Sequence, residues 1–116
     1  GEETAVLVQL ETRAALERAD EIAAVAGVDG VFFGPADIAA DMGLLGQPVH
    51  PQVWAAILPV AHALIARGVP VGTLVTDPAR ARSLLGEGFR FVACGIDTAI
   101  LARGADNLLK SMKDPG

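Results

Sequence analysis

The chain has 116 residues, of which 52% are hydrophobic, with a formal charge of −5 and a single cysteine. This composition excludes a disordered chain, an internal disulfide framework and a phosphate-backbone binder, which needs clustered lysine and arginine. No apolar stretch reaches the ~20 residues of a membrane span, and no secretory leader pattern opens the sequence. We therefore expect a packed cytoplasmic protein that binds neither nucleic acid nor a membrane.

Short apolar runs alternate with longer segments of helical periodicity along the chain. The runs of valine, leucine, isoleucine and phenylalanine predict strands at about 5–10, 28–33, 69–75 and 89–94. The segments between and after them predict helices at about 12–25, 36–42, 51–67, 77–86 and 97–112, with a kink or a new first turn at Pro59.

Four strand–helix units of this kind indicate a parallel sheet with helices packed against it. Two architectures fit the pattern: a small doubly wound sheet, or half of a (β/α)₈ barrel, whose full length is about 250 residues. In a half barrel the sheet edges would be open, which predicts self-association.

The first predicted strand carries polar residues on one of its faces. Strand alternation places Leu7, Gln9 and Glu11 together and leaves only apolar residues on the other face. In a barrel the polar face is the interior, and the C-terminal mouth of the strands holds the active site. Glu11 is therefore a candidate metal ligand or acid–base group. Alternatively, it is only the first exposed residue after the strand and helps to cap the next helix.

A second carboxylate follows the second predicted strand, in the run Gly34-Pro35-Ala36-Asp37. Neighbouring parallel strands would bring Asp37 to the same mouth as Glu11, where two carboxylates repel each other unless a cation lies between them. Oxygen ligands favour Mg²⁺ or Mn²⁺. The N–H groups at the start of the short helix would suit a substrate carboxylate. Alternatively, Asp37 is the N-cap of that helix.

Several segments, in collinear order, resemble the HpcH/HpaI family of class II pyruvate aldolases. The resemblance rests on residues 8–13 and 27–37 and continues through 41–43, 50–51, 72–74 and 95–98. It implies that residues 1–116 form the C-terminal half of a (β/α)₈ TIM barrel, an α/β fold with four parallel strand–helix units. The first residue is glycine rather than methionine, which would suit an excised fragment, a processed chain or a trimmed tag.

The resemblance also implies a role for each candidate site residue. Glu11 and Asp37 would hold a divalent metal, Mg²⁺ or Mn²⁺ with Co²⁺ as a further candidate. Gln9 would hold a water molecule near the metal, and Leu74 would line the pocket for the aldehyde. The substrate carboxylate would lie against the backbone of Gly34, Pro35, Ala36 and Asp37.

The implied activity is metal-dependent aldol cleavage and condensation of 4-hydroxy-2-oxo acids, giving pyruvate and an aldehyde through a metal-stabilised pyruvate enolate. The family's histidine base and substrate-clamping arginine come from the N-terminal half of the barrel, and no segment here matches them. We therefore expect no catalytic base in this chain. We also expect the chain to assemble with further copies of itself, in a trimer or hexamer, or with a complementary N-terminal half. The alternatives are a citramalyl- or malyl-CoA-type lyase, or a catalytically incomplete half-barrel that serves as an assembly module.

Four other residues favour structural roles. His50 is expected to cap a helix, and His62 to lie within one. Cys94 follows an apolar run and is expected to be a small buried residue. Trp54 is expected to pack a helix against the sheet or a neighbouring subunit. The segment 97–112 is expected to pack against a neighbouring subunit.

Overall fold

The computed structural model describes residues 6–94 and 99–102. The strands of this part are β1 (Leu7–Leu10), β2 (Gly30–Phe33), β3 (Val71–Val75), β4 (Phe91–Cys94) and β5 (Ala99–Ala102). The helices are α1 (Arg13–Glu17), α2 (Ala19–Ala23), α3 (Pro35–Asp41), α4 (Pro51–Ala66) and α5 (Pro78–Gly86). None of the helices in this part is long and apolar enough to cross a membrane.

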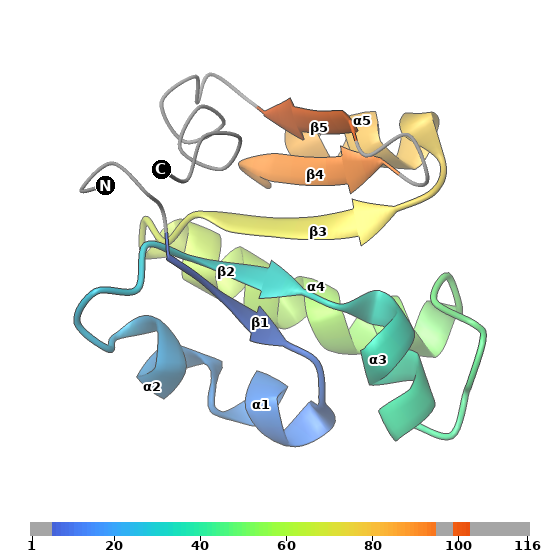
Figure 1. Ribbon diagram of the computed structural model, residues 1–116, viewed down its shortest axis with the longest axis horizontal. Coiled ribbons are helices and arrows are strands. Elements are labelled where there is room, and N and C mark those ends of the chain that lie inside the picture. Colours follow the sequence, from blue (N-terminus) through green and yellow to red (C-terminus); the bar gives the residue numbers. More distant parts are fainter. Residues whose placement is uncertain (1–5, 95–98, 103–116) are drawn as a thin grey trace.

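The five strands form one sheet in the order β1-β2-β3-β4-β5 (Figure 1). The first four are parallel, and the register places Gln9 opposite Phe32 and Phe33 opposite Thr73. Each parallel strand therefore pairs with its neighbour in the chain. A doubly wound sheet would instead reverse its strand order at a switch point. The observed order favours the wall of a barrel, and the predicted parallel α/β half-barrel topology is confirmed.

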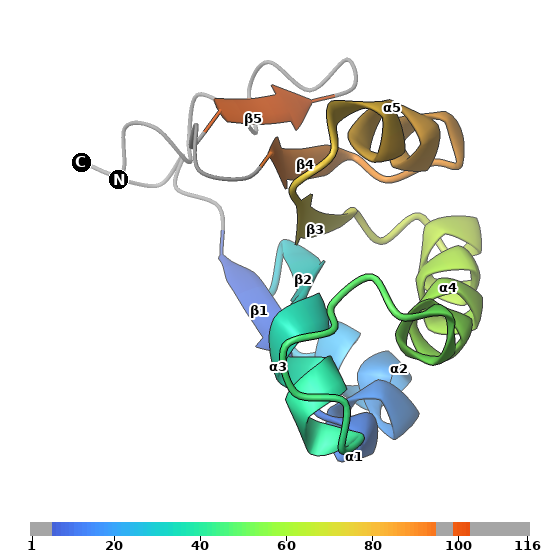
Figure 2. The ribbon, with the colours of Figure 1, turned by 90° about the vertical axis from the view of Figure 1, so that its right-hand side faces the viewer.

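The sheet is curved, and its helices lie on the outer side of the curve. Figure 2, which views the strands nearly end-on, shows β1 to β5 following an arc with α2, α4 and α5 on the same side. This is the arrangement of a barrel wall, in which helices form the outer ring. The opposite face of the sheet corresponds to the barrel interior.

Local chemistry explains where the helices begin. His50 Nδ1 accepts a hydrogen bond from the Gln52 N–H at 3.0 Å, and Asp77 Oδ1 accepts one from Ala79 at 3.0 Å. Each of these caps precedes a proline at the first helical position, where a missing N–H costs nothing. The predicted capping role of His50 is confirmed.

The core lies between the outer face of the sheet and the helices. Strand residues that face outward are fully buried against the apolar side of α4, and burying each such side chain contributes about 1.5–3 kcal/mol. The main members from the strands are Leu10, Val31, Phe33 and Val71, and those from α4 are Val53, Ile57, Ala61 and Leu64. Trp54, only 6% exposed, belongs to the same core, which confirms that it packs α4 against the sheet.

The inner face of the sheet contains one close aromatic contact. The Phe91 ring is 1% exposed and lies against Gly72 on the neighbouring strand, where a side chain would overlap it. The same ring stacks on Phe32, with centroids 6.1 Å apart and planes inclined by 20°. Gly72 therefore allows an aromatic side chain to cross β3 and reach β2.

Two helix predictions require correction. The expected helix at 12–25 is two short helices, because the chain turns at Arg18, whose N–H bonds the Ala15 carbonyl three residues back. The first helix packs on α4 and the second on β1, so the break allows the two helices to contact different elements. No glycine or proline marks it. Of the two outcomes expected at Pro59, the new first turn is wrong, because α4 continues through this residue, and the kink stays a prediction.

The prediction of a helix over 97–112 is wrong for residues 99–102, which form β5, antiparallel to β4. The remainder of that range lies outside the described residues. A short apolar run fits either a helix or a strand by periodicity alone. Residues 99–102 form a strand because the edge of β4 offers backbone N–H and C=O groups with which they can pair. This edge of the sheet is therefore paired rather than open.

Candidate active site

A cavity of about 420 Å³ lies at the C-terminal end of the parallel strands. This volume is within the range of small-molecule sites. Gln9 reaches it from β1, residues 34–37 from the start of α3, and Leu74 from β3. The far wall consists of Val49 and Trp54, from the segment that leads into α4 and from α4 itself.

The side chains that carry the two carboxylates of interest both approach Gly34. A Cβ built on Gly34 would lie 3.4 Å from Asp37 Oδ2 and 3.4 Å from the Cγ of Glu11, so these two atoms are at most twice that distance apart. Glu11 follows β1 directly, and Asp37 lies in the first turn of α3. A side chain at position 34 would therefore contact both Glu11 and Asp37.

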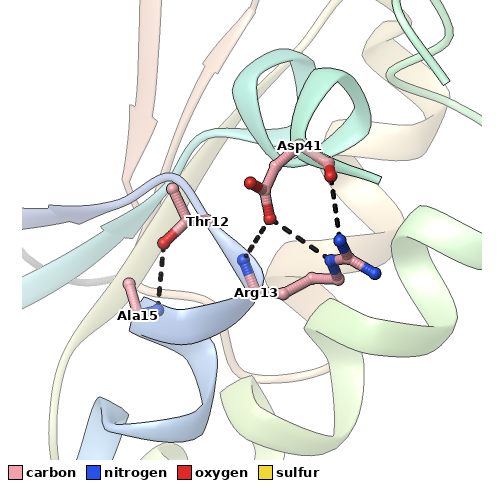
Figure 3. A network of polar contacts seen from close by, with 4 residues as sticks. All are labelled: Thr12, Arg13, Ala15 and Asp41. Carbon is pink, nitrogen blue, oxygen red and sulfur yellow. Dashed lines mark hydrogen bonds and ion pairs between the residues drawn. The ribbon is translucent and has the colours of Figure 1, made fainter. Parts of the chain in front are cut away.

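An ion pair joins the segments that carry these carboxylates (Figure 3). The Arg13 backbone N–H donates to Asp41 Oδ2 at 2.9 Å, Nε donates to the same oxygen at 3.3 Å, and Nη2 donates to the Asp41 carbonyl at 3.1 Å. Arg13 follows Glu11 by two residues, and Asp41 ends the helix that carries Asp37. The contact therefore fixes the distance between the two carboxylate-bearing segments.

The contact with Arg13 changes the pKa of the Asp41 carboxyl. The backbone N–H of Arg13 lowers the pKa of the Asp41 carboxyl, and the Arg13 side chain lowers it further by hydrogen bonding and by charge. The carboxylate therefore stays ionised and keeps the contact down to more acidic pH than an ordinary aspartate.

A buried hydroxyl supports the segment that carries residues 34–37. Thr73 is fully buried, and its Oγ1 donates a 2.9 Å hydrogen bond to the Phe33 carbonyl at the end of β2. The chain enters Gly34 and the proline at N1 of α3 immediately afterwards. Thr73 therefore fixes the strand end from which the candidate metal-binding loop begins.

The structure gathers every substrate-binding residue predicted from the sequence. Residues 9, 34, 35, 36, 37 and 74 line the one cavity. Glu11 is not part of its lining but meets Asp37 beside Gly34, at the edge of the cavity. Within the described part of the chain, no group of three or more His, Cys, Asp or Glu could hold a metal. The Glu11–Asp37 pair would thus form an incomplete shell that substrate and water could fill.

Sequence reasoning missed part of the cavity wall. Trp54 was assigned to packing alone, yet it also lines the cavity, and its indole N–H donates to the Pro48 carbonyl at 2.8 Å. Val49, which is 72% exposed, lines the cavity beside it. The available signal was a tryptophan in the first turn of a helix that follows a Gly/Pro-rich loop, since active sites of barrels are built from such loops.

The remaining singled-out residues have structural partners or intermediate burial. His62 lies within α4 as predicted, and its Nε2 is 3.0 Å from Glu87 Oε1. Cys94 is half-buried rather than fully buried, because it ends β4 near the mouth. Neither His50 nor His62 lines the cavity.

These features define an α/β barrel-type chain whose polar groups meet at the C-terminal ends of its strands. A family model described as HpcH/HpaI aldolase/citrate lyase matches residues 1–104, and the chain belongs to that family. The resemblance of the segments that flank Glu11 and Asp37 is thereby confirmed at the level of the family.

Named relatives extend the comparison. The chain is 48% identical over 113 residues to a hydroxypyruvate/pyruvate aldolase of Cupriavidus necator, covering 97% of this chain and 42% of that protein. It is 50% identical over 103 residues to a 4-hydroxy-2-oxo-heptane-1,7-dioate aldolase of Salmonella paratyphi B, covering 89% of this chain and 39% of that protein. It therefore spans about two-fifths of the length of these curated relatives.

A solved structure shows the same fold. A crystal structure of an HpcH/HpaI aldolase/citrate lyase family protein from Burkholderia cenocepacia superposes with a TM-score of 0.70 at 42% identity. The superposition covers 76% of this chain and 34% of that one. The strands and helices described above thus correspond to about a third of a complete family member.

Proposed function

We propose that this chain supplies the part of an aldolase that binds the metal and the 2-oxo acid, in an enzyme that cleaves and forms 4-hydroxy-2-oxo acids. The products of cleavage would be pyruvate and an aldehyde. The observation that carries the proposal is that the side chains of Glu11 and Asp37 both approach Gly34, which lines the cavity. The printed names of two relatives, a hydroxypyruvate/pyruvate aldolase and a 4-hydroxy-2-oxo-heptane-1,7-dioate aldolase, support the same reaction class.

The donor set fits a hard divalent cation such as Mg²⁺ or Mn²⁺. Glu11 and Asp37 offer only oxygen ligands, and the missing side chain of Gly34 leaves room between them. A cation there would also offset the repulsion between the two carboxylates. When bound, it would supply Lewis-acid polarisation of the oxo group of the substrate.

The other residues of the cavity would bind and orient the substrate. The N–H groups of Ala36 and Asp37 lie in the first turn of α3, where Gly34 has no side chain to cap them. They are therefore available to the substrate carboxylate. The Gln9 amide can donate to a substrate oxygen or hold a water molecule, and Leu74 offers an apolar wall to the aldehyde portion.

Turnover would require groups from outside these residues. The chain has two histidines, and neither lines the cavity, so the cavity lacks the imidazole base of the proposed reaction. The chain also spans about two-fifths of its relatives. We propose that further copies of the chain, or a complementary half-barrel, complete the site.

The metal site can be tested on the chain itself. Mn²⁺ is titrated calorimetrically in the presence of oxalate, an unreactive analogue of the pyruvate enolate, into the wild type and into Glu11→Ala and Asp37→Ala. Each substitution removes one of two charged ligands and is expected to weaken Mn²⁺ binding by at least about tenfold, since charge-assisted contacts contribute roughly 1.5–3 kcal/mol each.

A matched control is Glu17→Ala, which removes the same charge from an exposed position at the end of α1. It should bind Mn²⁺ as the wild type does. Circular dichroism establishes that each variant is folded. Absence of Mn²⁺ binding by the folded wild type would overturn the proposal, as would equal losses in Glu11→Ala and Glu17→Ala.

A further inference from the structure

A second cavity adjoins the candidate active site. Its volume is about 460 Å³, and it lies between the N-terminal ends of α4 and α5. Val49, Trp54, Val75 and Thr76 line both cavities, so the two are adjacent at the C-terminal mouth of the sheet. A ligand held at residues 34–37 would therefore extend toward this second cavity past Trp54.

The second cavity contains an arginine that forms no ion pair with any of the residues that the structure describes. The Arg80 guanidinium carbon lies 5.0 Å from the centroid of the Trp54 ring. None of the ion pairs found among the described residues involves Arg80, although Arg13, Arg18 and Arg67 each have a carboxylate partner. A guanidinium placed over an aromatic ring keeps its in-plane N–H donors available, and their fork matches a carboxylate or a phosphate.

One negative charge lies in the same cavity. Asp77 also lines it, but its Oδ1 is held at the start of α5, where it accepts the hydrogen bond from the Ala79 N–H. Asp77 forms no ion pair with Arg80, so within the described part of the chain no carboxylate neutralises the guanidinium. The rest of the lining contributes no charge: it consists of Val49, Pro51, Trp54, Val75 and Thr76.

We propose that Arg80 is a specificity-determining residue that binds an anionic group, a carboxylate or a phosphate, at the far end of the aldehyde partner. This proposal rests on the proposed aldolase function and names its substrate class. The oxo-acid end would lie at Glu11 and Asp37, and the aldehyde chain would pass Leu74 and Trp54 to reach Arg80. Aldehydes with an uncharged end would lose this contact.

The chain contains a single tryptophan, so its fluorescence reports on this cavity directly. Butanoate, propyl phosphate and butanamide are titrated separately into the metal-free chain, and the emission of Trp54 is followed. We expect at least one of the two anions to bind about tenfold or more tightly than the neutral amide. Which anion binds more tightly distinguishes a carboxylate-bearing from a phosphate-bearing aldehyde.

The variants isolate the guanidinium. R80Q is expected to weaken anion binding by about tenfold or more, and R80K by less, because lysine keeps the charge but loses the fork. R82Q is the matched control: Arg82 lies two residues further along α5, is exposed, and lines neither cavity. D77N keeps an N-cap residue, removes the opposing charge, and should tighten anion binding.

The proposal would be overturned if neither butanoate nor propyl phosphate bound more tightly than butanamide, or if R80Q and R82Q lost anion binding equally. Circular dichroism of R80Q, with R80K as the second variant, separates loss of the contact from loss of the fold. The proposed metal site is tested independently of the anion site, since Mn²⁺ with oxalate should bind R80Q as it binds the wild type. Anion binding without Mn²⁺ binding would reject the metal site and retain the anion site.

Discussion

Replacing Gly72 with alanine tests whether the inner face of the sheet is packed as described. A Cβ at position 72 would overlap the Phe91 ring. The ring is 1% exposed and stacks on Phe32, so it has little freedom to move aside. The substitution must therefore displace the ring, shift β3 away from β4, or both.

The cost can be placed within the known range for overpacked cores. Such substitutions destabilise by about 1–3 kcal/mol, and the extent of the overlap puts Gly72→Ala near the upper end, at about 3 kcal/mol. Replacing glycine by alanine within a strand should otherwise stabilise it by roughly 0.5–1 kcal/mol. The unfavourable effect of Gly72→Ala therefore comes from the aromatic neighbour alone.

The assay is urea unfolding of four chains: the wild type, Gly72→Ala, Phe91→Val and the double variant. With a slope of about 2 kcal/mol per molar urea, a cost of about 3 kcal/mol lowers the midpoint by about 1.5 M. Valine at position 91 has none of the ring atoms that would overlap the new methyl group. In that background Gly72→Ala should be neutral or stabilising, which gives a coupling energy of about 3 kcal/mol.

Gly86→Ala is the control, because Gly86 ends α5 and a Cβ there would meet nothing within 4 Å. It should leave the midpoint unchanged or raise it slightly. The reasoning would be refuted if Gly72→Ala had no larger effect than Gly86→Ala. It would also be refuted if the cost of Gly72→Ala were the same with phenylalanine and with valine at position 91.

Two further predictions concern the groups that support the site. The Arg13 N–H lowers the pKa of the Asp41 carboxyl. The ionised carboxylate therefore contributes to folding stability above the ordinary carboxyl pKa, and this contribution is lost as pH falls through the lowered pKa. Asp41→Asn should therefore show a smaller difference between thermal midpoints at pH 7 and pH 3 than the wild type, and identical differences would contradict this assignment. Thr73→Val removes the buried donor to the Phe33 carbonyl and should cost about 1–3 kcal/mol in urea unfolding and weaken Mn²⁺–oxalate binding, whereas Thr73→Ser should retain both properties. Equal effects of the two Thr73 substitutions would show that the hydroxyl is not the important group.

Much of the fold and of the candidate site follows from short-range sequence patterns. Alternation along the first strand placed Gln9 on the inner face, and in the structure Gln9 lines the cavity while Leu10 is fully buried in the core. The residues at 50–51 and 77–78 marked two helix starts, because a capping side chain and a proline act on backbone groups within one turn. Such signals need no knowledge of distant residues.

The features that the sequence did not predict all depend on contacts between distant segments. The turn at Arg18 follows from α1 and α2 packing on different partners, and residues 99–102 become a strand because β4 offers an edge to pair with. The same holds for the Arg13–Asp41 contact, which joins residues 28 apart, and for Arg80, which meets Trp54 only when α5 and α4 lie side by side.

The amino-acid sequence alone thus determined the four parallel strands, most helix starts, and which residues of the first strand face the barrel interior, because periodicity and capping are local effects. Only the tertiary structure decided that Glu11 and Asp37 both approach Gly34, and that Trp54 and Arg80 extend the cavity beyond Leu74. The physical reason is that these side chains come from different strand–helix units. Their separation is set by the curvature of the sheet and the packing of α4 and α5 on its outer face.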